Sequence, residues 1–179
     1  MSSIIDSFSR ALYLILNLNK ELMGIILLSI QVSGTALVVA TLLALPVSAL
    51  LGFRKFPLRG AIINVLNTFM GLPPVVVGLF VYLLLSRSGP LGFMALLYTP
   101  TAMIAAQSIL AFPIVASLSH SAIVGVDPIV RQASLTLGAT PVQTSLTVIN
   151  EARYGMMSAV IAGFGRVIAE VGAILIVGG

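Results

Sequence analysis

The last apolar stretch of the chain, Tyr154 to Gly179, is interrupted by only two charged residues, Arg166 and Glu170. Their spacing places both on one face of a helix, where a guanidinium and a carboxylate can pair and lower the cost of burying either charge in a membrane. Two roles are open. The pair could line a transport route or gate, with Arg166 available to an anion, or it could neutralise itself and lock two helices together.

Small residues surround this pair: Ala159, Gly163, Gly165, Ala169 and Gly172. Small side chains let membrane helices approach each other closely. The stretch therefore predicts an association face, and another subunit is its simplest occupant.

A second group of candidates lies in the polar interval from Asp127 to Arg153. Asp127 followed by Pro128 predicts the start of a helix, since aspartate is favoured at the N-cap and proline at the first helical position. Gly138 predicts the end of that helix, because glycine takes the left-handed C′ conformation without strain. Apolar residues recur between them at three- and four-residue spacing: Ile129, Val130, Ala133 and Leu137.

Thr140 and Gln143 predict a second helix start, because their spacing is that of a capping box. The interval therefore predicts a helix-turn-helix along the membrane surface, with Arg131 and Gln132 facing the cytoplasm. A short helix with a fixed turn can act as a rigid lever for a soluble partner that grips it. An ordinary interfacial loop is the alternative.

Membrane-spanning helices are the elements that must position these groups. Hydrophobic residues make up 59% of the 179 residues and charged residues only 8%, and the mean hydropathy is +1.15. This composition excludes an ordinary soluble domain. Each apolar run exceeds the roughly 20 residues that cross a bilayer core, so each span can close its backbone hydrogen bonds internally. We expect four spans, at about residues 24–52, 60–86, 100–122 and 155–178.

Prolines lie inside several of these expected spans, at Pro46, Pro73, Pro74 and Pro113. The adjacent Pro73 and Pro74 remove two backbone donors, so the second span should be kinked or broken near them. Carbonyls freed by the break need a polar cavity or a neighbouring helix. Such a break is a candidate element of a transport pathway, and a plain kink used for packing is the alternative.

The placement of charge predicts the orientation in the membrane. The net charge of the chain is +4, and three of its cations lie together between the first two expected spans: Arg54, Lys55 and Arg59. This is the positive-inside pattern of a cytoplasmic loop. Loops 53–59 and 127–153 are therefore expected to lie in the cytoplasm.

The N-terminal segment 1–21 is expected to be external, interfacial and amphipathic. Apolar residues recur at helical spacing over residues 3–18, opposite polar and charged ones. A short extra span that runs into the first long helix is the alternative.

Several kinds of chemistry are excluded by the sequence. It has no cysteine, so it can form neither disulfides nor thiolate metal sites. It has no glycine-rich phosphate loop followed by Lys and Ser or Thr, so it is expected to borrow energy rather than hydrolyse ATP. The only histidine, His120, is predicted to serve packing or an interface rather than a proton relay. We expect no catalytic site, metal site or cofactor in this chain, and no nucleic-acid partner.

The polar interval resembles the EAA loop in the membrane subunits of bacterial and archaeal ABC importers. In that motif Glu-Ala-Ala is followed, after three residues, by Gly. Gln132-Ala133-Ser134 and Gly138 stand at these positions, so Gln132 replaces the usual Glu and Ser134 the second Ala.

Two further segments, at residues 71–78 with 88–92 and at residues 163–173, resemble the permeases of molybdate, tungstate and sulfate importers. The segment at residues 150–153 is most similar to the tungstate branch. The resemblance covers about residues 24 to 179.

This resemblance implies an all-α integral membrane protein with a type I ABC importer permease fold over residues 22–179. It implies a homodimer, cytoplasmic ATPase subunits that bind ATP and Mg, and an external solute-binding protein that delivers an oxyanion. Tungstate is expected first, and molybdate or sulfate next. Related permeases continue through at least one more helix, so a C-terminal helix is expected to be missing here.

The resemblance also implies roles for particular residues. The residues expected to couple to the ATPase subunit are Asp127, Arg131, Gln132, Ala133, Ser134 and Gly138. Those expected to line or gate the pathway are Pro73, Pro74, Arg166 and Glu170.

Two other functions remain open from the residues alone. A secondary transporter or channel should show an internal repeat or an ion-filter sequence, and neither is found. A membrane assembly protein would use the Asp127 to Arg153 interval only as a tether.

Overall fold

The computed structural model describes residues 20–178. The helix expected over residues 3–18 lies outside them. The described chain is built of helices, in the order α2 to α8 with one short 3-10 helix, η1 (Gly92–Met94). The expected all-helical membrane fold is confirmed, because two helices qualify as spans alone and up to four spans result if each bent pair is counted as one.

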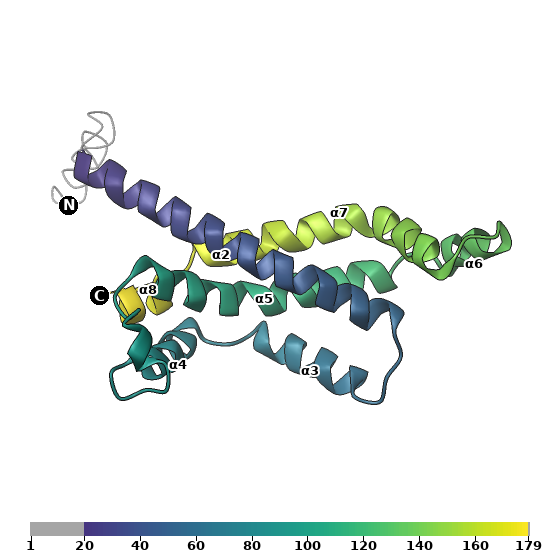
Figure 1. Ribbon diagram of the computed structural model, residues 1–179. Helices are drawn as coiled ribbons and strands as arrows, with labels where there is room; N and C mark the ends of the chain where they lie inside the picture. Colours follow the sequence, from purple (N-terminus) through teal and green to yellow (C-terminus); the bar gives the residue numbers. More distant parts are fainter. Residues whose placement is uncertain (1–19, 179) are drawn as a thin grey trace, which may run out of the picture.

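Two long helices form the centre of the bundle, α2 (Lys20–Phe53) and α5 (Pro100–Val124). At a rise of about 1.5 Å per residue they measure roughly 51 and 38 Å, enough to cross a bilayer. Pro46 and Pro113 lie inside these helices without ending them. Figure 1 shows α2 running obliquely across α5.

The second expected span is broken, as Pro73 and Pro74 predict. Helix α3 (Arg59–Phe69) ends before the prolines, α4 (Pro74–Leu85) begins at the second of them, and the two meet at 105°. Pro73 is extended, with ψ of 128°, because the ring of Pro74 disfavours the helical conformation in the residue before it.

The last span departs from expectation at both ends. Helix α7 (Pro141–Ile168) begins well before residue 155, and a break of three residues separates it from α8 (Gly172–Gly178), with a bend of 59°. Arg166 and Glu170 therefore do not share one helix. The sequence has no proline at this break, so no local signal predicts it.

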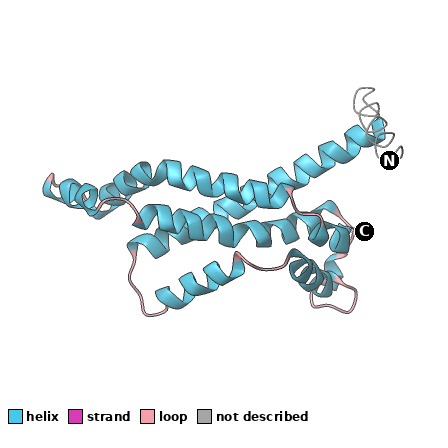
Figure 2. Cartoon of the chain, turned by 180° about the vertical axis from the view of Figure 1, so that it is seen from behind, coloured by secondary structure: helices cyan, strands magenta, loops and turns pink. Residues whose placement is uncertain are grey.

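Small residues set the spacing of the bundle. Helix α2 presents a stripe at intervals of four residues that is fully buried: Ala36, Ala40, Ala44 and Ser48. This stripe lets α5 approach closely enough for the Ser108 hydroxyl to donate a hydrogen bond to the Ala36 carbonyl at 3.2 Å. Helix α7 packs against both α2 and α5, as the rear view in Figure 2 also shows.

Several residues of the predicted association face pack within the chain instead of facing another subunit. Ala159 and Gly163 are buried, and a Cβ at Gly163 would lie 2.7 Å from Val115 of α5. At Gly172 a Cβ would lie 3.2 Å from Val75 of α4. Gly165, with open space around it, and Ala169 are exposed and remain available to a partner.

The glycines at 163 and 165 provide a matched test of this close packing. Gly163→Ala should lower the free energy of unfolding by about 1–3 kcal/mol, because the stiff Val115 side chain must move. Gly165→Ala should be neutral or stabilise by up to about 1 kcal/mol, because alanine favours the helix and meets nothing. Thermal unfolding of both variants in one detergent measures the difference. Equal melting temperatures would show that the α5–α7 approach is not tight at residue 163.

Candidate functional site

The first candidate group lies on α6 (Pro128–Thr136), which has the start that the sequence predicts. The Ile129 amide donates to a carboxylate oxygen of Asp127 at 2.8 Å, and Pro128 occupies the first turn. Gly138 ends the helix with φ of 83°. The next amide, that of Ala139, donates to the Ser134 carbonyl at 3.0 Å. Both ends of α6 are therefore held by specific hydrogen bonds.

Helix α7 starts immediately after this turn. The Thr140 amide donates to the Gln143 side-chain oxygen at 2.8 Å, and the Gln143 amide donates to the Thr140 hydroxyl at 3.3 Å. The predicted capping box is thus confirmed. The expected second short surface helix, however, is the first part of the 28-residue α7, since no proline and no glycine occurs between residues 142 and 154.

The surface of α6 is open. None of its residues is buried; Arg131, Gln132 and Ala133 are exposed, and Ser134 is half-buried with its hydroxyl donating to the Val130 carbonyl at 2.8 Å. Leu137, beside the turn, is 88% exposed. Helix α6 packs chiefly against α7. It therefore projects from the end of the bundle, as Figure 1 shows.

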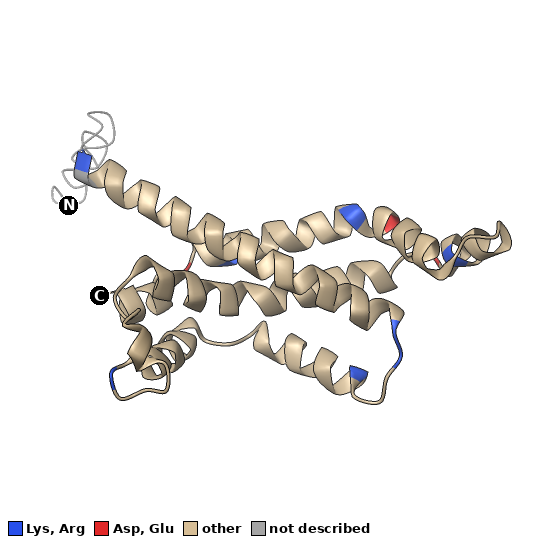
Figure 3. Cartoon of the chain, viewed as in Figure 1, with Lys and Arg blue, Asp and Glu red and all other residues tan. Residues whose placement is uncertain are grey.

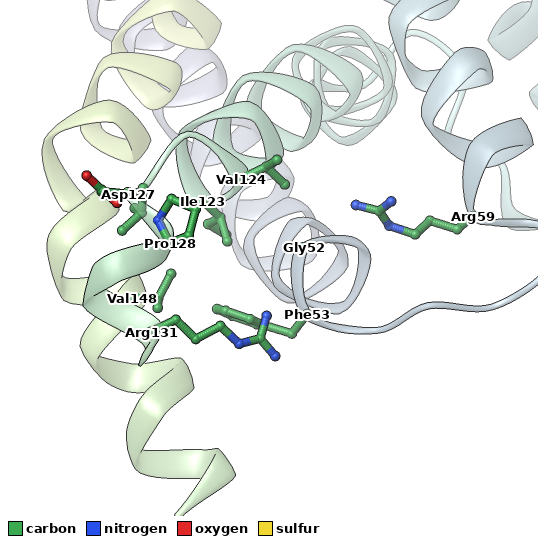
Figure 4. Close-up of a pocket in the computed structure, with 10 residues that line it drawn as sticks. Gly52, Phe53, Arg59, Ile123, Val124, Asp127, Pro128, Arg131 and Val148 are labelled. Atoms are coloured by element: carbon green, nitrogen blue, oxygen red, sulfur yellow. The ribbon is translucent and has the colours of Figure 1, made fainter. Parts of the chain in front are cut away.

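A pocket of about 210 Å³ lies where α6 meets the ends of α2 and α5. Figure 4 shows Arg131 beside Phe53, with Arg59 approaching from the other side of α2. Arg59 is held there, because its Nε donates to the Leu51 carbonyl at 2.6 Å and its Nη2 lies 3.4 Å from His120 Nε2. His120 thus contacts a neighbouring element, consistent with its predicted interface role.

The second candidate group lies at the two helix breaks. Arg166 Nη2 donates to the Leu72 carbonyl at 3.1 Å, which ties α7 to the break between α3 and α4. The expected ion pair with Glu170 is wrong: in the described chain Glu170 instead accepts from the Ala173 amide at 3.2 Å. Because α7 ends at Ile168, Glu170 falls in the second break and caps α8.

The structure brings these two breaks together. Pro73 and Pro74 adjoin Leu72, and Gly172 packs against Val75 just beyond them. Gly78 of α4 lies against the backbone of α8, since a Cβ there would be 2.8 Å from Ala173 Cα. The pathway candidates therefore form one group, separate from the coupling candidates on α6.

One polar residue of this region is not among those predicted from the sequence. Gln107, fully buried in α5, donates its side-chain amide to the Val167 carbonyl at 3.5 Å and so serves the end of α7. Its signal was available: a glutamine amid the apolar residues of an expected span. Within residues 20–178 no three His, Asp or Glu side chains cluster as a metal site would require.

Comparison with known proteins gives several relatives. A probable anion ABC transporter permease protein of Haloferax volcanii is 48% identical, over 88% of this chain and 68% of that protein. The tungstate uptake system permease protein TupB of Peptoclostridium acidaminophilum is 40% identical over the whole chain and 78% of its own length. The molybdenum transport system permease protein ModB of Azotobacter vinelandii is 26% identical, over 90% of this chain and 75% of that protein. No family model matches the chain.

Identity of 48% and 40% over more than two thirds of these relatives is far above chance. The helical structure fits these relatives, because two of its helices are long and apolar enough to cross a membrane, or up to four spans result if each bent pair is counted as one. The chain belongs to the family of ABC transporter permeases that includes the tungstate and molybdenum permeases, and it is a multi-pass membrane transport subunit, not an enzyme.

Proposed function

We propose that this permease passes tungstate across the cytoplasmic membrane, with molybdate the next candidate and sulfate after it. The observation that carries the proposal is the 40% identity to a tungstate uptake permease over the entire chain. A second tungstate permease, from Campylobacter jejuni, is 36% identical over 98% of the chain. The molybdenum permeases are more distant, at 25–29% identity.

An ABC importer permease works with an ATPase subunit and a solute-binding protein. For the ATPase we propose α6 with its flanking residues, Asp127 to Gly138, as the docking element. Two features support this proposal: the helix is short and exposed, and the Leu137 side chain beside its C-terminal end is exposed as well. An exposed apolar side chain near the aqueous end of a membrane protein is suited to bind in a groove of a partner. In this assignment Asp127 and Gly138 fix the two ends, and Arg131, Gln132, Ala133 and Ser134 form the helix between them.

The cytoplasmic side is proposed from charge. The α2–α3 loop, with Arg54 and Lys55, lies at the same end of the bundle as α6, as Figure 3 shows. Basic loops favour the cytoplasm, so the docking helix and the basic loop share that side. In this orientation, lipid surrounds the apolar sides of the helix bundle.

For the pathway we propose the paired helix breaks, with Pro73, Pro74, Arg166 and Glu170. Irregular backbone at membrane depth is tolerated only where protein or a water-filled cavity covers it. A cation at such a place suits a passing dianion.

A second copy of the chain is proposed to pack along α7. Exposed apolar residues recur on this helix at alternating intervals of three and four: Tyr154, Met157, Ile161, Phe164 and Ile168. Such spacing forms the seam of a left-handed helix pair, and Gly165 beside it allows close approach. These features support a homodimer.

Uptake by the reconstituted complex tests the cargo. Proteoliposomes that contain the permease, its ATPase subunit and its binding protein should accumulate tungstate only when ATP is supplied on the ATPase side. Molybdate should compete, and sulfate should compete less well. Accumulation of none of the three would contradict the proposal.

Gly138 tests the docking element. Gly138→Val forces a β-branched residue to a φ of 83°, at a cost of about 1–2 kcal/mol, although the site has room for it. We expect normal membrane insertion with lost uptake. Gly138→Asn is the matched control, because asparagine tolerates this conformation, and it should retain uptake. Full uptake by Gly138→Val would instead favour the tether interpretation.

Cross-linking tests the dimer. The chain has no cysteine, so Met157→Cys introduces a single thiol on the α7 seam. In native membranes a short bifunctional thiol reagent should give a covalent dimer. Leu42→Cys, at a comparably exposed apolar position on α2, is the control and should stay monomeric. Equal cross-linking of both would argue against the seam.

A further inference from the structure

The Leu72 carbonyl occupies an unusual position. In an unbroken helix it would accept from the Val76 amide, but that amide donates to the Pro73 carbonyl at 3.0 Å. Arg166 supplies the donor instead, from a residue 94 positions away. The break between α3 and α4 is therefore held by a side chain of another helix.

Arg166 has bonding capacity in reserve. A guanidinium offers five N–H donors, and here its Nε is buried without a hydrogen-bond partner. Glu170, the nearest acid along the chain, is occupied with the start of α8 and makes no ion pair with it. Among the described residues, the hydrogen bond found for the Arg166 guanidinium is the one to the neutral Leu72 carbonyl.

We propose that Arg166 acts as a latch that the cargo releases. Its hydrogen bond to the Leu72 carbonyl holds the α3–α4 break, and an arriving oxyanion replaces this bond by binding the guanidinium. This inference rests on the proposed function. It goes further by naming the bond that the cargo replaces.

The exchange follows from acceptor strength. Hydrogen bonds between a guanidinium and an anionic oxygen are roughly twice as strong as those to neutral acceptors, and a tetrahedral oxyanion can accept two in parallel. A dianion that reaches Arg166 therefore competes well against the single bond to Leu72. No covalent step is involved, and the bond to Leu72 can re-form once the anion has passed.

Loss of the bond to Leu72 would allow movement that is transmitted to other helices of the permease. Helix α4 packs on α8 through Gly78 and Ala173, so the freed break and the second break can move together. Arg166 also lies on α7, whose other end is the capping box beside α6. A change at the latch is therefore linked mechanically to the proposed docking helix, and by reciprocity a change at α6 affects the latch.

The test uses the complete complex of permease, ATPase subunit and binding protein in proteoliposomes. Arg166→Gln removes the charge and keeps an amide donor for Leu72, whereas Arg166→Lys keeps the charge. We expect Arg166→Gln to lower the maximal tungstate uptake rate about tenfold, with the half-saturating concentration of loaded binding protein unchanged, and Arg166→Lys to restore part of the rate. Lys20→Gln, which removes an exposed cation at the start of α2, is the control and should transport normally.

A thiol placed in the break reports the latch directly. In the Met70→Cys variant, tungstate-loaded binding protein should speed labelling of the new thiol by maleimide. In the double variant Met70→Cys with Arg166→Gln, the loaded binding protein should leave the labelling rate unchanged. Labelling that responds equally in both backgrounds overturns the latch, as does normal uptake by Arg166→Gln. Loss of uptake in Arg166→Lys equal to that in Arg166→Gln, with a lowered melting temperature in both, also overturns it in favour of a purely structural role. Absence of uptake by the unmutated complex would instead contradict the proposed function.

Discussion

The hydrogen bond from Arg166 to the Leu72 carbonyl addresses the constraint that governs the whole chain. Inside a bilayer no solvent satisfies a free backbone group, so each interrupted helix needs a donor or acceptor from the protein itself. The first break takes its donor from Arg166, and the second takes its acceptor from Glu170. Gln107 serves the last turn of α7 in the same way. These three side chains thus serve backbone groups at or beside the breaks.

These long-range bonds depend on how closely the helices approach. The alanine stripe of α2 and the glycines of α7 remove the side chains that would hold the helices apart. In lipid, packing of this kind replaces the hydrophobic effect as the force that associates helices. The breaks therefore meet because the unbroken parts of the bundle are packed tightly.

Local signals made much of the fold predictable. Pro73 and Pro74 predict the first break, and the caps at Asp127 and Thr140 predict two helix starts, because each signal acts within four residues of the backbone that it controls. The end of α7 was not predictable in this way. It depends on Glu170 turning to Ala173, and on Gln107, 60 positions distant. The interpretation of Arg166 and Glu170 as an ion pair failed for the same reason, since it assumed one continuous helix.

Helix α7 connects the two candidate groups, and its rigidity decides how they communicate. A Cβ at Gly155 would lie 2.7 Å from Ala122, and one at Gly163 equally close to Val115, so α7 is pressed onto α5 at two places about 12 Å apart along its axis. A helix held at two points cannot bend freely between them. Displacement at α6 must therefore move α5 and α7 as a pair, and the α7 end of that pair carries Arg166. The bond to Leu72 is the contact through which this pair holds the first helix break, so it is where such a displacement would be felt.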